Sequence, residues 1–241
     1  MIYIVGDTHA DIDYKKLVNC FIKDQLLPKP TKNDTIIQVG DLGFVLDLPD
    51  NISPTEIYLK EWISAKPWKL ITAGGNHENW DRVLKLPVST VPWPEGNDAY
   101  QYTDNVFFAR RGRIYEIENK TFFFMGGATS TDKDSRVPFV SWWPEEIPTQ
   151  DEFAAGLAEL EKVNMEVDYV ITHTFPRTIV NLLGFTNATC PVSNYLEYLL
   201  NCGLKFKKWY GGHFHVDVKI PYKHDSEIIC LMDKIEVLNE E

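Results

Sequence analysis

The chain has 241 residues, which is long enough for a domain with a sizeable core, and its apolar fraction of 44% is ordinary for a soluble globular protein. An excess of acidic residues gives a net charge of −11, which argues against a broad surface for duplex nucleic acid. A phosphorylated ligand stays open, because bound metal ions can supply positive charge locally.

The sequence carries no sign of a membrane segment or of export. No apolar run approaches membrane-spanning length, and the first residues lack the basic region and the cleavage site of a signal peptide. The four cysteines are scattered and form no CxxC motif. We expect a cytoplasmic protein with reduced thiols and no membrane contact. No boundary is visible along the chain, so we expect one domain over residues 1–241.

The first half of the chain predicts three buried strands, each followed by a glycine turn with polar residues. The strands are Ile2–Val5, Thr35–Val39 and Leu70–Ala73. The turns after them are Gly6-Asp7-Thr8-His9, Gly40-Asp41 and Gly74-Gly75-Asn76-His77-Glu78. Ligand sites of layered α/β proteins favour the carboxyl ends of strands, and these turns are therefore candidate site elements.

Two helices are expected between these strands. One follows Asp13, with an apolar stripe of Leu17, Val18, Phe21 and Ile22. The other begins at Ser53-Pro54-Thr55-Glu56, where serine caps the helix, proline takes its first position and glutamate its third. Its core-facing residues are predicted to be Ile57, Leu59, Trp62 and Ile63.

The second half predicts more strands and two irregular stretches, residues 86–105 and 130–148. The strands are Val106–Ala109, Arg113–Ile117, Thr121–Met125, Asp168–Thr172, Val216–Ile220, Glu227–Leu231 and Ile235–Leu238. A capping box of Thr149 and Glu152 begins a helix, and residues 193–201 predict a second one. The core-facing stripe of the capped helix is Phe153, Leu157, Leu160 and Val163. Two more polar clusters are Thr172-His173 and Gly211-Gly212-His213-Phe214-His215.

Five of the six histidines lie in these strand-end clusters, and only His224 lies outside them. A single buried histidine is more often structural than a ligand, but that explanation does not suit five. The polar residues collected there are Asp7, His9, Asp41, Asn76, His77, His173, His213 and His215. Oxygen and nitrogen ligands without thiolates suit manganese, iron, zinc or nickel. The set is too large for one tetrahedral zinc and suits two ions that share a carboxylate.

The order D-x-H, G-D, G-N-H-E, H, G-H-x-H resembles the calcineurin-like metallophosphoesterase superfamily from Asp7 to His215. The resemblance implies an α/β fold with four layers, αββα, in which helices flank two mixed β-sheets. It implies two divalent ions, with manganese favoured, and Asp41 as the bridging carboxylate. One ion would be held by Asp7, His9, Asp41 and His215, and the other by Asp41, Asn76, His173 and His213. His77 would act on the leaving group.

These roles predict hydrolysis of phosphate esters. Two cations about 3.5–4 Å apart lower the pKa of a shared water and yield a hydroxide that attacks phosphorus. A protonated His77 would donate to the leaving oxygen, oriented by Glu78 or Asp81. The substrate would be a phosphodiester or phosphomonoester, small or nucleotide-like.

The Asp-Arg-Gly motif of the superfamily's protein phosphatases is missing, because Leu42-Gly43 follows Asp41. The chain therefore looks more like small prokaryotic or phage-type members. A protein phosphatase remains an alternative. A non-catalytic scaffold is an alternative of another class, although such proteins usually lose ligands that this chain retains.

The irregular stretch 130–148 is a candidate substrate loop, because long loops in compact domains are often functional. Arg136 can bind a phosphate oxygen in a bidentate manner, which Lys133 cannot. Trp142 and Trp143 offer flat faces for a base or an aromatic leaving group. The alternative is that the tryptophans pack the loop onto the body while Arg136 pairs with Glu145 or Glu146.

Overall fold

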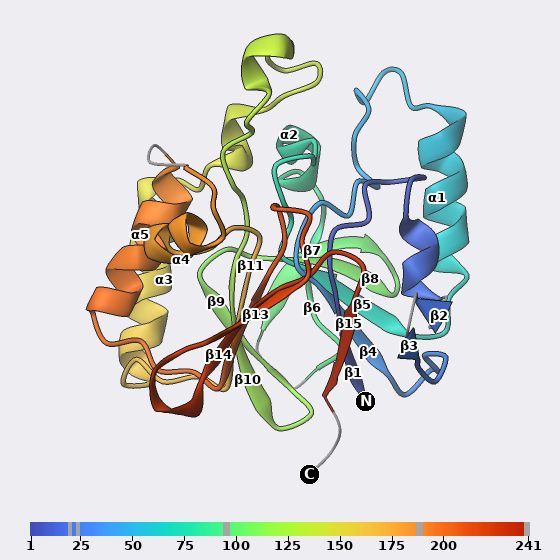
Figure 1. Ribbon diagram of the computed structural model, residues 1–241. Coiled ribbons are helices and arrows are strands. Elements are labelled where there is room, and N and C mark those ends of the chain that lie inside the picture. The colour runs from blue at the N-terminus through green and yellow to red at the C-terminus, as the bar shows by residue number, and fades with distance from the viewer. Residues whose placement is uncertain (19–20, 23–24, 94–96, 187–189, 239–241) are drawn as a thin grey trace.

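Two mixed β-sheets lie face to face at the centre of the molecule (Figure 1). This computed structural model describes residues 1–18, 21–22, 25–93, 97–186 and 190–238. The first sheet has the order β15 (Ile235–Leu238), β1 (Ile2–Val5), β4 (Thr35–Gln38), β5 (Lys69–Thr72), β8 (Val106–Ala109), β7 (Asp98–Thr103) and β6 (Val88–Thr90). The second has the order β13 (Val218–Pro221), β14 (Glu227–Cys230), β12 (Lys208–Gly211), β11 (Tyr169–Thr172), β10 (Lys120–Met125) and β9 (Arg113–Ile117).

The centre of each sheet is parallel, which brings several strand ends to one edge. In the first sheet β1, β4, β5 and β8 run parallel, and Gln38 pairs with both Val5 and Thr72. In the second sheet β10, β11, β12 and β14 run parallel. Because paired residues lie at the same height, the turns that follow β1, β4 and β5 leave the sheet side by side.

Helices cover the outer faces of both sheets (Figure 1). The helix α1 (Pro54–Ser64) packs on the first sheet, where α2 (Trp80–Val83) and the 3₁₀ turn Tyr14–Leu17 also lie. The helices α3 (Gln150–Lys162), α4 (Arg177–Leu182) and α5 (Pro191–Asn201) pack on the second. Short 3₁₀ turns at Lys133–Ser135, Pro144–Glu146 and Lys223–Asp225 and the small hairpin β2 (Phe21–Ile22) and β3 (Gln25–Leu26) complete the described elements.

Side-chain alternation divides the core into three layers. Along β1, Ile2 and Ile4 enter the cluster between the sheets, whereas Tyr3 and Val5 enter the cluster under α1. The third cluster joins the second sheet to α3, α4 and α5. Fully burying one such aliphatic side chain stabilises the fold by about 1.5–3 kcal/mol, so three apolar layers hold the two sheets rigidly as one support.

The four-layer αββα arrangement expected from the sequence is confirmed. The caps are confirmed too: the Ser53 side chain accepts a hydrogen bond from Glu56 N, and Thr149 forms the capping box with Glu152. Along α3, Phe153 and Leu160 are buried as expected, and Leu157 and Val163 pack against the same cluster. The short helix α4 and the single turn of α2 were not anticipated.

Three local predictions are wrong. The chain after Asp13 forms a 3₁₀ turn up to Leu17, and Phe21–Ile22 pairs with Gln25–Leu26 instead of continuing a helix. Ile57 is exposed, because Glu56 takes the buried position to bind Arg82. Residues 86–105 contain β6 and β7, the last two strands at one end of the first sheet, with β6 at its edge, where the polar composition that indicated a loop is tolerated.

Among the described residues, no helix is both long and apolar enough to cross a membrane. Cys190, Cys202 and Cys230 are free cysteines, and Cys20 lies outside the described residues.

Candidate metal centre

The polar turns meet at the carboxyl edge shared by the two sheets. Asp7 and His9 follow β1, Asp41 follows β4, and Asn76 and His77 follow β5. From the second sheet, His173 follows β11, while His213 and His215 follow β12. Strands of both sheets therefore contribute side chains to one cluster.

The backbone is strained where it presents these side chains. His9, Asp41, His213 and His215 all have positive φ values, between 47° and 69°, in the left-handed region that non-glycine residues rarely adopt. Glycines allow the close approach: a Cβ on Gly75 would collide with the Asp41 carboxylate, and one on Gly212 with the Asp7 carboxylate. Strain of this kind persists where the surroundings enforce it, as at functional sites.

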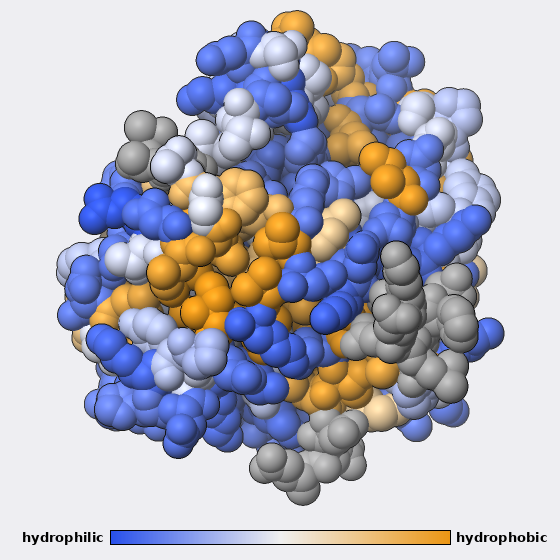
Figure 2. Space-filling model, viewed as in Figure 1, coloured by the Kyte–Doolittle hydropathy of each residue, from blue (hydrophilic) through white to orange (hydrophobic). Residues whose placement is uncertain are grey.

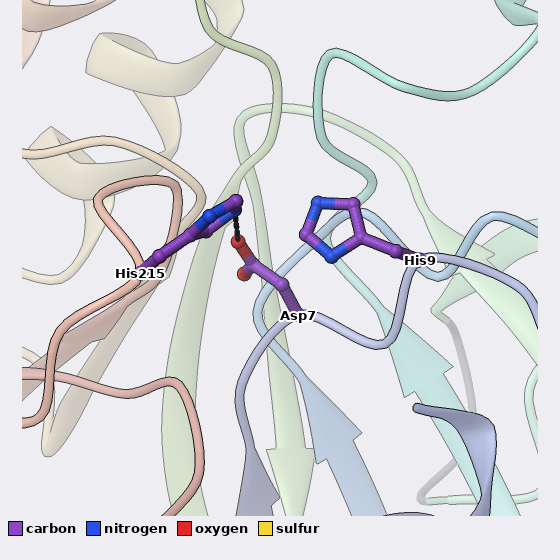
Figure 3. Close-up of side chains that lie close together, drawn as sticks. All are labelled: Asp7, His9 and His215. Atoms are coloured by element: carbon purple, nitrogen blue, oxygen red, sulfur yellow. Dashed lines mark ion pairs between the residues drawn. The ribbon is translucent and has the colours of Figure 1, made fainter. Parts of the chain in front are cut away.

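The first group of ligand-type side chains is Asp7, His9 and His215, with ligand atoms within 4.8 Å of one another. Figure 3 shows the two histidines approaching the Asp7 carboxylate from opposite sides. His215 Nε2 lies 3.6 Å from Asp7 Oδ2, and the rings of His9 and His215 are 4.8 Å apart. Asp7 Oδ2 also accepts a hydrogen bond from His213 N at 2.9 Å, which fixes the carboxylate against the β12 turn.

A second group surrounds the Asp41 carboxylate. Asp41 Oδ2 lies 3.2 Å from His173 Nε2 and 3.4 Å from His9 Nε2, so Asp41 faces side chains of both groups. Asn76 Oδ1 lies 3.0 Å from His173 Nε2. The ring of His213 packs edge-on against that of His173, with the centroids 5.0 Å apart. All seven residues expected as ligands are thus gathered in one place.

Buried charge and unpaired atoms fit divalent ions at this place. Asp7 and Asp41 are both buried, and two close carboxylates need positive charge between them. Asp7 Oδ1 and His173 Nδ1 are buried atoms with no hydrogen-bond partner among the described residues. Burial lowers the pKa of His173, but Asp41 and Asp7 outweigh it and raise that pKa to about 9. Without metal ions, a proton on His173 thus supplies part of the positive charge that balances the Asp7 and Asp41 carboxylates.

His77 lies beside Asp41 and contacts Arg136. His77 Nε2 is 4.0 Å from Asp41 Oδ2, and Arg136 Nη2 is 2.9 Å from His77 Nδ1. Burial lowers the pKa of His77, and Arg136 adds to this effect, although Asp41 acts in the opposite direction. This direction favours the neutral form of His77, whereas the protonated form was expected from the sequence.

The carboxylates expected to orient His77 are engaged elsewhere. Glu78 is buried and accepts hydrogen bonds from Leu42 N and Gly75 N, both at 2.8 Å, so it ties the β4 turn to the β5 turn. Asp81 pairs with Lys85 on the surface. The partner of His77 is Arg136, which stands 59 positions further along the chain.

The loop 130–148 lies over the site and combines both of the alternatives weighed above. Arg136 binds Asp132 at 2.8 Å and reaches His77, so it pairs with neither Glu145 nor Glu146. Trp143 is only 5% exposed and belongs to the core under α1, which makes it a packing residue with no free face for a ligand. Trp142 is half-buried, and Lys133 is exposed.

Of three supporting residues, Arg111 and Ser130 carry no signal in the sequence, and Glu146 is expected there only as a partner of Arg136. Arg111 is buried over the Trp80 ring, 3.6 Å from its centroid, and donates to the carbonyl oxygens of Glu145 and Glu146. Ser130 and Glu146 are buried and bind each other. They stand at the ends of an irregular stretch without periodicity, and only folding brings them together.

Comparisons with known proteins give the family. The family model of calcineurin-like phosphoesterases matches residues 1–217, and the chain belongs to this family. The protein is therefore a metal-dependent phosphoesterase, of a family that depends on two metal ions. No match to a curated protein was found.

Solved structures resemble the chain at low identity. GAP50, the anchor in the inner membrane complex of Plasmodium, is 14% identical with a TM-score of 0.51, over 96% of this chain and 70% of that one, and shows the fold alone. Phosphopantetheinyl hydrolase from Mycobacterium tuberculosis is 15% identical with a TM-score of 0.46, over 96% and 89% of the two chains. A putative 5'-nucleotidase from Staphylococcus aureus, in complex with alpha-ketoglutarate, is 16% identical with a TM-score of 0.44, over 95% and 48%.

Proposed function

We propose that the protein hydrolyses small or nucleotide-like phosphate esters with two divalent ions at the strand-end cluster. One ion is held by Asp7, His9, Asp41 and His215, and the other by Asp41, Asn76, His173 and His213. The observation that carries the proposal is the position of Asp41, whose Oδ2 lies within 3.4 Å of nitrogens of both His9 and His173. A carboxylate between the two ligand groups suits the bridging role.

The bound ions supply a nucleophile from water at neutral pH and neutralise charge on the phosphoryl oxygens. The chain supplies the rest. Asp41 is ionised, because His173 and His9 bring its pKa well below the usual range although burial acts in the opposite direction. It also accepts a hydrogen bond from His77 N at 2.8 Å, which fixes His77 beside the reacting group.

Arg136 determines which nitrogen of His77 carries the proton. Arg136 Nη2 lies 2.9 Å from His77 Nδ1 and 3.3 Å from His77 Nε2. Because a guanidinium only donates hydrogen bonds, the shorter contact favours Nδ1 as the acceptor. The neutral ring then keeps its proton on Nε2, the nitrogen on the Asp41 side. We propose that His77 donates this hydrogen bond to the leaving oxygen, while Arg136 binds a phosphate oxygen of the substrate when one is present.

The alternative of a protein phosphatase lacks support at the β4 turn. Arginine is missing after Asp41, and Leu42, Phe44 and Val45 are buried in the core, where they cannot contact a substrate. Exposed Lys133 and half-buried Trp142 in the loop 130–148 suit a small or nucleotide-like ester instead. Manganese is the first candidate for the ions, with iron, zinc or nickel as further ones.

The test combines metal removal with a substrate panel. Chelation should abolish hydrolysis of an aryl phosphate, and added manganese should restore it. A panel of phosphomonoesters, cyclic and linear nucleotides, dinucleotides and phosphopeptides then ranks kcat/KM. Full activity after complete metal removal would disprove the metal role. Preference for phosphopeptides would favour the protein phosphatase, and metal binding without any hydrolysis would favour the scaffold.

A further inference from the structure

A buried hydrogen-bond chain runs from Asn76 into the loop 130–148. Asn76 Nδ2 donates to Ser130 Oγ at 3.1 Å, and Ser130 Oγ donates to Glu146 Oε2 at 2.5 Å. Ser130 N donates to the other oxygen of Glu146 at 2.9 Å. The three residues are 4%, 1% and 1% exposed, so water offers them little competition for these bonds.

The direction of this chain fixes the orientation of the Asn76 amide. Glu146 accepts hydrogen bonds from both Ser130 N and Ser130 Oγ, so the hydroxyl proton of Ser130 is directed to Glu146. The Ser130 oxygen is then an acceptor and holds the NH₂ group of Asn76. The other end of the amide, Oδ1, must face the opposite way, toward His173 Nε2 at 3.0 Å. Among the described residues, Ser130 Oγ is the hydrogen-bond partner of the Asn76 amide nitrogen.

The same two residues close the base of the loop. Ser130 and Glu146 stand at its two ends, and Arg111 binds the backbone carbonyl of Glu146 at 3.2 Å. From within the loop, Arg136 reaches His77. The loop therefore contacts two consecutive residues of the β5 turn: its base contacts Asn76, and Arg136 contacts His77.

We propose that Ser130, held by Glu146, is a positioning residue that aims the Asn76 oxygen at one of the two ions. The inference rests on the proposed role of Asn76 as a ligand. Groups behind a metal ligand orient it, and their loss typically weakens metal affinity about 10–100-fold. Ser130 touches only Asn76 in the ligand set, so its loss should weaken one ion and spare the other.

Calorimetric titration with Mn²⁺ tests this without any substrate. The variants are Ser130→Ala, Asn76→Ala and the double variant, with Ser135→Ala as the matched control, because Ser135 is an exposed serine of the same loop. We expect Ser130→Ala to weaken one of two binding events about 10–100-fold. In the Asn76→Ala background, removing Ser130 should change nothing further, because the two residues act through one contact.

Glu146→Gln is a second variant that keeps the side-chain shape. Each of the two Glu146 oxygens accepts one hydrogen bond from Ser130, at N and at Oγ. Glutamine replaces one of these oxygens with an NH₂ donor, so the donor–acceptor order of the hydrogen-bond chain is lost. The same single event should weaken, whereas Glu145→Gln, which removes the neighbouring charge, should bind as the wild type does. Thermal denaturation of each variant identifies any that fail to fold.

The outcomes separate the two proposals. If folded Ser130→Ala and Glu146→Gln bind both ions as tightly as the wild type, or lose both equally, the positioning role is wrong. An effect of Ser130→Ala that persists undiminished in the Asn76→Ala background also contradicts it. If the wild type itself binds fewer than two ions, the proposed dimetal site fails.

Discussion

Two regions of different construction meet at the metal centre: the strand-end turns and the loop 130–148. Each turn is the direct continuation of a buried strand, and its ligand-type side chains need only the register of the sheets to meet. The loop contains two short 3₁₀ turns and has an exposed apolar tip, where Val137, Phe139 and Val140 are 50–59% exposed. In Figure 2 an apolar area lies at the top of the molecule, where Figure 1 places this loop.

The loop is held by the buried Trp143 side chain and a few polar contacts, and not by a sheet. Ser130 with Glu146 closes its base, Arg111 binds its backbone, and Arg136 joins it to His77. This difference in construction predicts different effects of substitutions in the two regions. Changes in the strand-end turns should affect the metal ions and hence all substrates. In the loop, Ser130 and Glu146 should act on one ion and Arg136 should act through His77, whereas Trp142 should affect only particular substrates.

Asp41→Asn should have the largest effect. The change removes the charge that faces both ligand groups, so we expect loss of both ions and activity below detection. The measurement is metal content together with hydrolysis of an aryl phosphate. A variant that retains two ions would show that Asp41 is not the bridge.

His77→Asn should retain metal and lose rate. His77 is expected to donate a hydrogen bond to the leaving oxygen, and loss of one such donor typically costs about 10²–10³-fold in kcat. Metal content and kcat separate this result from that of Asp41→Asn. Loss of both ions from His77→Asn would instead make His77 a ligand, as its membership of the group His9, Asp41 and His77 allows.

The sequence predicts the strand-end region well for a local reason. An apolar run, a glycine and a polar residue stand within a few positions of one another, and both the strand and its turn follow from that short pattern. The turns after β1, β4 and β5 are all located in this way. The parallel register then brings these turns together, because it places the carboxyl ends of the strands at one edge of the sheet.

Contacts between distant segments could not be predicted in the same way. Glu78 is adjacent to His77 in sequence and looked like its partner, but it binds backbone amides, while Arg136 takes that place from the loop. The chain after Asp13 has a helical apolar stripe, yet it forms a 3₁₀ turn and a hairpin, because tertiary packing overrides a weak local preference. Neither outcome is encoded within a short window.

Metal affinity should fall as the pH falls, because the metal-free strand-end cluster holds a proton on His173, whose pKa is about 9. A metal must displace that proton, so affinity should drop about tenfold per pH unit below the pKa. Calorimetry in buffers of different ionisation enthalpy counts the protons released. Affinity that stays constant between about pH 6 and pH 8 would contradict the coupling.

The same proton stabilises the metal-free fold. The pKa of His173 in the folded protein lies above its ordinary value of 6.5, so this stabilisation is complete below about pH 6.5 and is lost as the pH rises through about 9. Thermal melting of the chelated protein across this range should therefore show a falling Tm. The metal-loaded protein is the control, because its His173 carries no proton to lose.

The smallest effects are expected for the two candidate substrate-binding residues of the loop, Arg136 and Trp142, and they distinguish the roles of these residues. Arg136→Ala should lower kcat/KM for both an aryl phosphate and a nucleotide-like ester, because Arg136 contacts His77. Trp142→Ala should act on the nucleotide-like ester more strongly, by about tenfold, since stacking on a base is worth about 1–3 kcal/mol. The quantity to compare is the ratio of kcat/KM for the two esters in each variant, with the Tm measured alongside. Equal losses on both esters after Trp142→Ala, together with a lowered Tm, would make Trp142 a packing residue like Trp143.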